Sequence, residues 1–202
     1  MPQRRRERRF RSPPWHGPPR GTVPGVVPVE LVIARNEKVA VFVARVAAYP
    51  TGFEIELQAI SRDEDDDLDP MLFMQGHFRR TRRGDEIPTE ILRFGVQFAD
   101  GSKATNTDGG RFDPSGPPNG PVMQEQGGGG GSGSWEQSYW IWPLPPSGPL
   151  TFVCEWPAAD IPLTRLELDA QAILDTSGRA QVIFSEEHLP DPPSSGGTVI
   201  SI

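Results

Sequence analysis

Residues 53–60 alternate strictly between apolar and polar side chains, and this alternation limits the fold more than any other feature of the chain. The apolar positions of the run are Phe53, Ile55, Leu57 and Ala59. The polar positions between them are Glu54, Glu56 and Gln58. A period of two places successive side chains on opposite faces of an extended strand, so one face is buried and the other is wet. Such strands favour antiparallel pairing, because the strands of a parallel sheet are buried on both faces.

Other apolar runs, separated by turn residues, also have the character of strands. Segment 91–98 alternates in the same way and carries inward apolar residues at Leu92, Phe94, Val96 and Phe98. The remaining predicted strands are Val29–Arg35, Val39–Tyr49, Trp135–Trp142, Leu150–Trp156 and Ala180–Phe184, and two short candidates are Met71–Phe78 and Lys103–Thr105. The sequence therefore predicts a mainly β fold, an antiparallel β-sandwich of about seven to eight strands with one short C-terminal helix.

The segment Ile161–Gly178 fits two periods at once. Thr164 and Glu167 have the spacing of a helix capping box, and Gly178 fits the residue that follows a helix end. The helical period is met by Leu166, Ala170, Ile173 and Leu174. Period two is met by Leu166, Leu168, Ala170, Ala172 and Leu174. We expect a helix over residues 163–178 because the capping residues stand where a helix needs them, and a strand is the alternative.

Composition divides the chain into three parts. Residues 1–25 are rich in Arg and Pro and predict a disordered arm. Residues 26–184 predict the β-sandwich domain, interrupted by a long Gly/Pro-rich loop at 106–134 that contains Gly127–Gly131. The composition of that loop favours disorder, and the glycine run has the character of a linker. Residues 185–202 predict a flexible tail.

Charge is divided unevenly between the arm and the rest of the chain. Residues 1–25 hold seven Arg and one Glu, whereas the remaining residues hold 13 basic and 26 acidic side chains. An acidic body repels phosphate, which argues against a broad nucleic-acid surface. The arm is a possible anion-binding element through Arg4, Arg5, Arg6, Arg8, Arg9 and Arg11. Phe10 and Trp15 would be available there to stack on bases.

Three observations bear on the location of the protein. No run approaches 18 consecutive apolar residues, so no membrane span is predicted. The single cysteine, Cys154, excludes an internal disulfide framework. The N-terminal arginines are followed by four prolines between Ser12 and Arg20, where a secretory signal needs an apolar stretch. The sequence therefore predicts a cytoplasmic protein that does not enter a membrane.

Four motifs carry a resemblance to a known family. They are PPWHGPP at 13–19, AYPTGFE at 48–54, WPLPP at 142–146 and FVCEWP at 152–157. With these motifs the chain resembles an uncharacterised family of bacterial proteins from high-GC genomes, over most of residues 13–184. The resemblance implies no activity and no site residues, because that family has no established function.

Tryptophans gather around one proline-rich connection. Trp140 and Trp142 precede Pro143–Pro149, and Trp156 ends the strand that follows. If the two flanking strands pair, their aromatic side chains form one continuous surface, either as a wall of the core or as an exposed platform. The residues of this predicted interaction surface are Trp135, Trp140, Trp142 and Trp156.

The acidic run at 63–69 has the aspartate spacing of the first half of a calcium-binding loop. Its aspartates match the first ligand positions of an EF-hand, but Leu68 stands where glycine is needed and Met74 where glutamate is needed. An EF-hand is therefore rejected, and a looser calcium site in residues 61–70 is left as an alternative to a solvated loop. The basic residues of 79–83 would face this loop in exposed pairs of about 0–1 kcal/mol each.

Signals for catalysis are weak. The histidines His16, His77 and His188 have no Cys or His at metal-ligand spacing. Cys154 lies on a predicted apolar face, where an inert packed thiol is expected. No nucleophile elbow, P-loop or dinucleotide fingerprint is present. We therefore predict no catalytic residues, no metal and no cofactor.

These observations lead to three hypotheses of function. The first is a non-catalytic protein-interaction or scaffold module, with another protein as the partner. The proline-rich segments Pro13–Pro19 and Pro143–Pro149 would then serve as ligands for the partner or as rigid covers on the sheet. The second is a carbohydrate-binding or hydrolytic protein that uses a Trp-lined cleft near Trp140, Trp142 and Glu155. The third is tethering of nucleic acid or another anion by the Arg-rich arm. The oligomeric state is not predicted.

Overall fold

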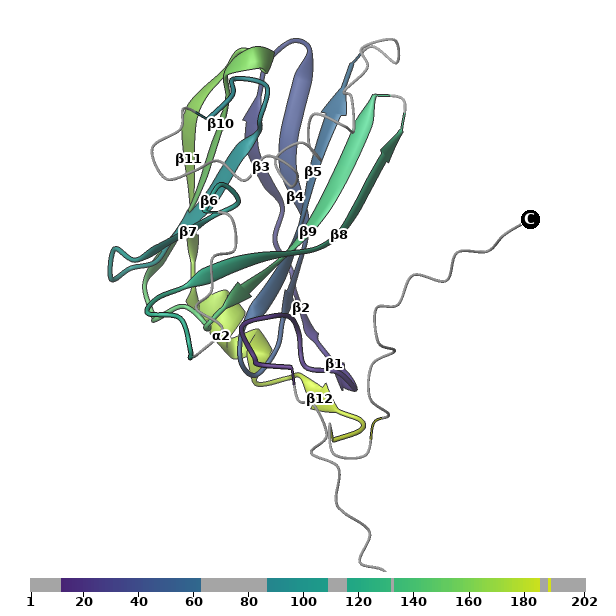
Figure 1. Ribbon diagram of the computed structural model, residues 1–202, viewed down its shortest axis with the longest axis vertical. Helices are drawn as coiled ribbons and strands as arrows, with labels where there is room; N and C mark the ends of the chain where they lie inside the picture. Colours follow the sequence, from purple (N-terminus) through teal and green to yellow (C-terminus); the bar gives the residue numbers. More distant parts are fainter. Residues whose placement is uncertain (1–11, 63–86, 109–115, 132, 186–188, 190–202) are drawn as a thin grey trace, which may run out of the picture.

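The computed structural model describes residues 12–62, 87–108, 116–131, 133–185 and 189. In these residues the chain forms twelve strands, one short α-helix and one 3-10 helix, and all of the strand pairs are antiparallel. Two sheets face each other as a β-sandwich, and a small two-stranded sheet lies at one end (Figure 1). The predicted fold class is confirmed, and the strands beyond the expected number are mostly short. No helix in this part of the chain is long and apolar enough to cross a membrane.

The larger sheet has the order β2-β4-β5-β9-β8, with β3 also paired to β4. Its strands are β2 (Gly25–Val27), β3 (Leu31–Arg35), β4 (Val39–Ala48), β5 (Phe53–Ser61), β8 (Val122–Gly131) and β9 (Ser134–Trp142). The smaller sheet has the order β11-β10-β6-β7. Its strands are β6 (Arg93–Gln97), β7 (Lys103–Thr105), β10 (Pro149–Trp156) and β11 (Ile161–Asp169).

The remaining elements lie at the two ends of the sandwich. At one end a 3-10 helix covers Pro157–Ala159 in the connection between β10 and β11. At the other end the strands β1 (Thr22–Val23) and β12 (Gln181–Val182) pair with each other. The helix α2 (Gln171–Ser177) contacts β2, β4 and β11 (Figure 1). Its Ile173 is buried in the main core, so α2 closes the space between the sheets.

The main core fills the space between the two sheets and follows the predicted alternation. Residues opposite each other in an antiparallel ladder share a face, so each cross-strand row of the larger sheet lies wholly inside or outside. One inner row is Ala48, Phe53, Ile141 and Met123. In the smaller sheet the inner residues include the predicted Phe94, Val96, Phe152 and Cys154, all of them buried. The expected inward faces of segments 53–60 and 91–98 are therefore confirmed.

The predicted helix over 163–178 is wrong in its first half. Residues Ile161–Asp169 form the edge strand β11, in which Thr164 lies opposite Cys154. The Thr164 hydroxyl donates to the carbonyl of Pro162 at 2.9 Å, so it does not cap a helix. Pairing with β10 buries Leu166 and Leu168 against the core, and this contact outweighs the local capping pattern. Only residues 171–177 are helical, and Gly178 follows the helix as expected.

The predicted loop at 106–134 is wrong where it includes the glycine run. Residues Val122–Gly131 form β8, which pairs with β9 along its length. Glycine is required at alternate positions of this strand. A Cβ atom on Gly128 would lie 2.6 Å from the carbonyl oxygen of Glu136, and one on Gly130 would lie 2.8 Å from that of Ser134. The run is a closely packed edge strand, because only residues without side chains allow β8 to approach β9 there.

A pair of substitutions in β8 tests this interpretation. Gly128→Ala is expected to lower the free energy of unfolding by about 1–3 kcal/mol, because its methyl group meets backbone atoms of β9. Gly129→Ala is the matched control, since a Cβ atom at that position has no atom within 4 Å. The control is expected to be neutral or to stabilise by about 0.5 kcal/mol. Urea unfolding of both variants measures the difference, and equal values would contradict the close approach.

Several predicted segments lie partly or wholly outside the described residues. They are the arm residues 1–11, the strand Met71–Phe78, the acidic run at 63–69, the basic cluster at 79–83 and most of the tail at 185–202. The disordered arm predicted for 1–25 is too long. Residues 12–25 are described, and they include β1 and a turn packed on the larger sheet.

Candidate functional site

The four tryptophans of the predicted surface occupy two different environments. Trp135 and Trp156 belong to the main core between the sheets. The Trp156 indole N–H donates to the carbonyl of Glu90 at 2.9 Å. Trp140 and Trp142 lie on the outer face of the larger sheet, Trp140 fully buried and Trp142 half-buried. The continuous aromatic surface, which depended on pairing of the two flanking strands, therefore does not form.

The reason lies in the connection between β9 and β10. The two strands do not pair, since β9 lies between β5 and β8 while β10 lies between β6 and β11. The prolines of residues 143–149 carry the chain from one sheet to the other, starting at a cis bond between Trp142 and Pro143. Strand alternation then places Trp140 outside, while Phe152 and Trp156 point into the core from the opposite sheet.

An aromatic patch forms on the outer face of the larger sheet. We define it as the cluster of Ala47, Tyr49, Trp140 and Trp142, which is separate from the main core, together with its polar neighbours Glu54, Gln124 and Gln126. The rings of Tyr49 and Trp140 meet edge to face, with their centroids 5.5 Å apart. Ala47, Glu54, Trp140 and Gln124 form one cross-strand row on this face. The patch therefore has aromatic, carboxylate and amide groups side by side.

The N-terminal residues Ser12–Pro19 cover this patch and are called the strap below. The strap contains a turn, in which the His16 N–H donates to the carbonyl of Pro13 at 3.0 Å. Pro14 occupies the second position of that turn, where its fixed φ angle suits the geometry. The ring of Trp15 contacts that of Trp142 edge to face at 5.7 Å.

Two side-chain donors of the sheet hold the strap. The Trp140 indole N–H donates to the carbonyl of Pro14 at 2.9 Å, and the Gln126 amide donates to the carbonyl of His16 at 3.0 Å. Gln126 lies at the register shift of β8, where a bulge redirects a side chain. The sequence predicts a disordered arm that includes the strap, with a rigid cover on the sheet as one role of its prolines, but it does not predict the contacts with Trp140, Trp142 and Gln126. The WHGPP motif next to the prolines was the available signal.

One polar group of the patch is left without a partner. The amide nitrogen of Gln124, beside Trp140, is buried and makes no hydrogen bond to the described residues. A buried donor in this state costs about 1–3 kcal/mol. Next to it, Arg45 forms ion pairs with Glu54 and Glu56. Burial, and then the charge of Glu54, raises the pKa of Tyr49, so the phenol remains protonated at neutral pH.

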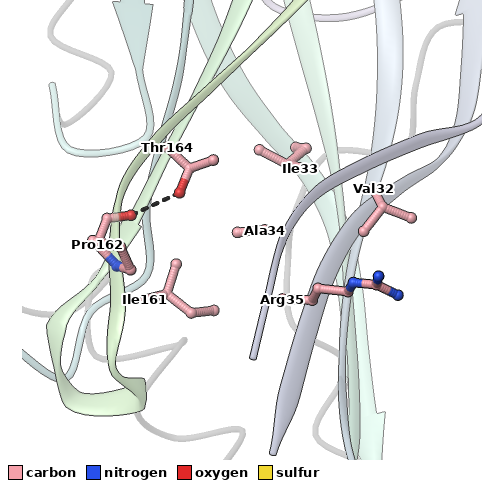
Figure 2. A pocket seen from close by; sticks show the side chains of 7 residues that line it. All are labelled: Val32, Ile33, Ala34, Arg35, Ile161, Pro162 and Thr164. Carbon is pink, nitrogen blue, oxygen red and sulfur yellow. Dashed lines mark hydrogen bonds between the residues drawn. The ribbon is translucent and has the colours of Figure 1, made fainter. Parts of the chain in front are cut away.

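A second feature is a groove between the edges of the two sheets, called the edge groove below (Figure 2). It has a volume of about 470 Å³ and is lined by Val32, Ile33, Ala34 and Arg35 of β3 and by Ile161, Pro162 and Thr164 of β11. Ile33, Ala34 and Ile161 turn toward the space between the strands, whereas Val32 and Arg35 point to the other side of β3. Four consecutive residues of β3 line the groove, so it runs along the backbone edge of that strand.

The two borders of the edge groove differ in chemistry. On β3, Val32 is 58% exposed, and exposed Arg35 forms no ion pair with any described residue. On β11, the exposed residues after Pro162 include Arg165, Glu167 and Asp169. Alternating charges and a proline protect an edge strand against pairing, and β3 lacks this protection.

The described part of the chain does not bring potential catalytic groups together. Cys154 is fully buried in the core. Burial, and then the charge of Glu155, raises the pKa of its thiol to about 12, so the reactive thiolate is not formed at neutral pH. Glu155 is paired with Arg93 at 2.6 Å on the outer face of the smaller sheet. The described residues contain no group of three or more His, Cys, Asp or Glu placed to hold a metal ion. The predicted arginines of the arm, 4 to 11, lie outside the described residues.

Comparisons with protein-family models, with curated proteins and with solved structures give no match. The resemblance to a bacterial family therefore stays a prediction. The candidate functional sites are the aromatic patch and the edge groove.

Proposed function

We propose that the protein is a non-catalytic interaction module that binds an extended segment of another protein in the edge groove. The observation that carries this proposal is the position of β3. It pairs with β4 on one side, and among the described strands none pairs with its other side, where the edge groove lies. An open strand edge offers backbone N–H and C=O groups, which an extended peptide can satisfy by adding a strand.

The added strand would pair with β3 rather than with β11. The border formed by β11 begins with Pro162, which has no N–H, and continues with alternating charges. The border formed by β3 has apolar or small residues at three of four positions and ends at Arg35. These features support β3 as the acceptor, with β11 as the opposite wall of the groove.

The lining also supports a preferred ligand chemistry. Side chains of an added strand alternate, so those on the inner side would meet Ile33 and Ala34 and those on the outer side would meet Val32 and Arg35. Apolar or small residues fit the inner positions. An acidic residue fits the outer position beside Arg35, whose guanidinium has no carboxylate partner among the described residues. The ligand is therefore an extended apolar segment that carries an acidic side chain.

The test uses an array of synthetic peptides of about eight residues, the length of an ordinary strand, with alternating apolar and charged positions. We expect acidic members to bind the full chain more tightly than basic members by roughly tenfold. Binding is measured by fluorescence anisotropy of the labelled peptide. Hydrogen exchange then locates it, since strand addition slows exchange of the amides of β3.

Two substitutions and one control test whether the peptide binds in the edge groove. Thr164→Arg fills the groove from the β11 side and is expected to weaken peptide binding by roughly tenfold or more. Glu167→Arg lies on the same strand, is exposed and does not line the groove, so it is the matched control. Arg35→Glu is expected to reverse the preference from acidic to basic peptides. An array without binders, or binding that is unchanged in Thr164→Arg, would contradict the proposal.

A further inference from the structure

We infer that the aromatic patch is a second recognition site, specific for a proline–tryptophan turn, and that the straps of two copies of this chain exchange between their patches. In the described structure the strap occupies the patch of its own chain. In the exchanged dimer each strap would occupy the patch of the other copy through the same contacts. This inference concerns the outer face of the larger sheet and does not depend on the edge groove.

The strap is recognised through groups that any copy of it can supply. They are two backbone carbonyls, of Pro14 and His16, and the ring of Trp15. The turn that presents them is closed by a hydrogen bond within the strap, from His16 to Pro13. The strap is thus a local unit with its own geometry, and its contacts with the sheet do not require that both belong to one chain.

The patch is also separate from the main core. Ala47, Tyr49 and Trp140 form their own cluster, and the opposite face of the same sheet carries the residues that pack between the sheets. Release of the strap would therefore uncover aromatic rings and leave the main core closed. A large uncovered aromatic surface favours a new partner, and the strap of a second copy is the partner with matching groups.

The position of the strap makes exchange simple. It precedes β1, and β1 can remain paired with β12 when the strap moves. Arg20 and Gly21 lie between the strap and β1, and Gly21 has a φ of 69°, a conformation that glycine adopts readily. Two straps exchanged in this way form a closed, two-fold symmetric contact, the commonest form of protein dimer.

The unpaired amide of Gln124 favours exchange further. In the described structure the patch offers N–H groups from Gln124, Gln126 and Trp140, and the strap uses those of Gln126 and Trp140. The Gln124 amide is thus a further donor on this face, which a backbone carbonyl of a second copy can satisfy beside the exchanged strap.

The recognition site is tested with a synthetic peptide of residues 12–20 and the full chain carrying Trp15→Ala, which weakens its own strap. We expect the peptide to bind this variant, and to bind the wild-type chain at least roughly tenfold more weakly, because the tethered strap competes at high effective concentration. Titration calorimetry measures both affinities. The same peptide with alanine in place of tryptophan is the control and is expected not to bind.

Exchange is tested by analytical ultracentrifugation, which measures the molar mass of the wild-type protein in solution over a wide range of protein concentrations. We expect a monomer–dimer equilibrium that Trp15→Ala abolishes and that Gln126→Ala, an exposed position, weakens. Thr164→Arg in the edge groove is expected to leave the dimer unchanged, which separates this result from the proposed function. If the peptide fails to bind the Trp15→Ala chain, the recognition site is refuted. If the wild-type chain stays monomeric up to millimolar concentration, exchange is refuted.

Discussion

Replacing Phe94 with alanine is expected to lower the free energy of unfolding by about 3–5 kcal/mol, as large-to-small changes of buried aromatic residues do. Phe94 lies in β6 and is almost completely buried. Its ring stacks on that of Phe152 in the same sheet at 6.2 Å and meets that of Tyr139 in the other sheet at 5.8 Å. Its loss opens a cavity at the contact between the sheets. Urea unfolding is expected to show a lower midpoint with an unchanged slope.

The chain offers a matched control for this substitution. Phe184 is 59% exposed near the end of the described chain, so Phe184→Ala removes the same atoms from a site in contact with water. The control is expected to change the free energy of unfolding by no more than about 0.5 kcal/mol. Similar losses for the two variants would mean that the sheets are not joined through Phe94.

Alkaline pH is expected to unfold the protein steeply, because two core groups resist losing their protons. Burial raises the pKa of Cys154 to about 12 from an ordinary value of 9.0. Burial also raises the pKa of Tyr139 far above its ordinary value of 10.0. In the unfolded chain both groups ionise near their ordinary values, so above pH 9 the unfolded state binds fewer protons than the folded state. Stability therefore falls as the pH rises.

The expected slope is about 1.4 kcal/mol per pH unit for each group that is ionised only in the unfolded state. Thermal unfolding measured from pH 8 to pH 12 is expected to show a decline that begins near pH 9 with Cys154 and steepens above pH 10 with Tyr139. Cys154→Ala removes the thiol and is expected to delay the decline until about pH 10. A melting temperature that is constant from pH 9 to pH 12 would contradict the burial of both groups.

The sequence predicts the faces of the strands well, because strand alternation is a local property. Phe53, Ile55, Phe94 and Phe152 are all buried as expected, and Glu54 and Glu56 are turned outward. The requirement that apolar groups leave water fixes this alternation without knowledge of the neighbouring strand. The inert state of Cys154 follows from the same pattern, since an inward position on a core strand excludes the solvent that a thiolate needs.

Pairing between distant strands could not be predicted from local patterns. The proline connection after Trp142 predicts a hairpin when only its flanks are considered, whereas β9 and β10 belong to different sheets. The glycine run has the composition of a linker, but the neighbouring strand β9 requires residues without side chains at Gly128 and Gly130. The residues that the strap contacts could not be predicted for the same reason. The contact between Trp15 and Trp142 joins residues that are far apart in the sequence.

The tryptophans differ in burial, so intrinsic fluorescence can report on two different changes of the structure. Trp135, Trp140 and Trp156 are shielded from water, whereas Trp15 and Trp142 are partly accessible on the outer face. A polar collisional quencher therefore reaches only the second pair in the intact molecule, while a red shift of the emission spectrum requires loss of the core. Release of the N-terminal segment is therefore detected as increased quenching, and global unfolding is detected as a red shift of the emission. Both are measured in one fluorescence experiment without an added dye.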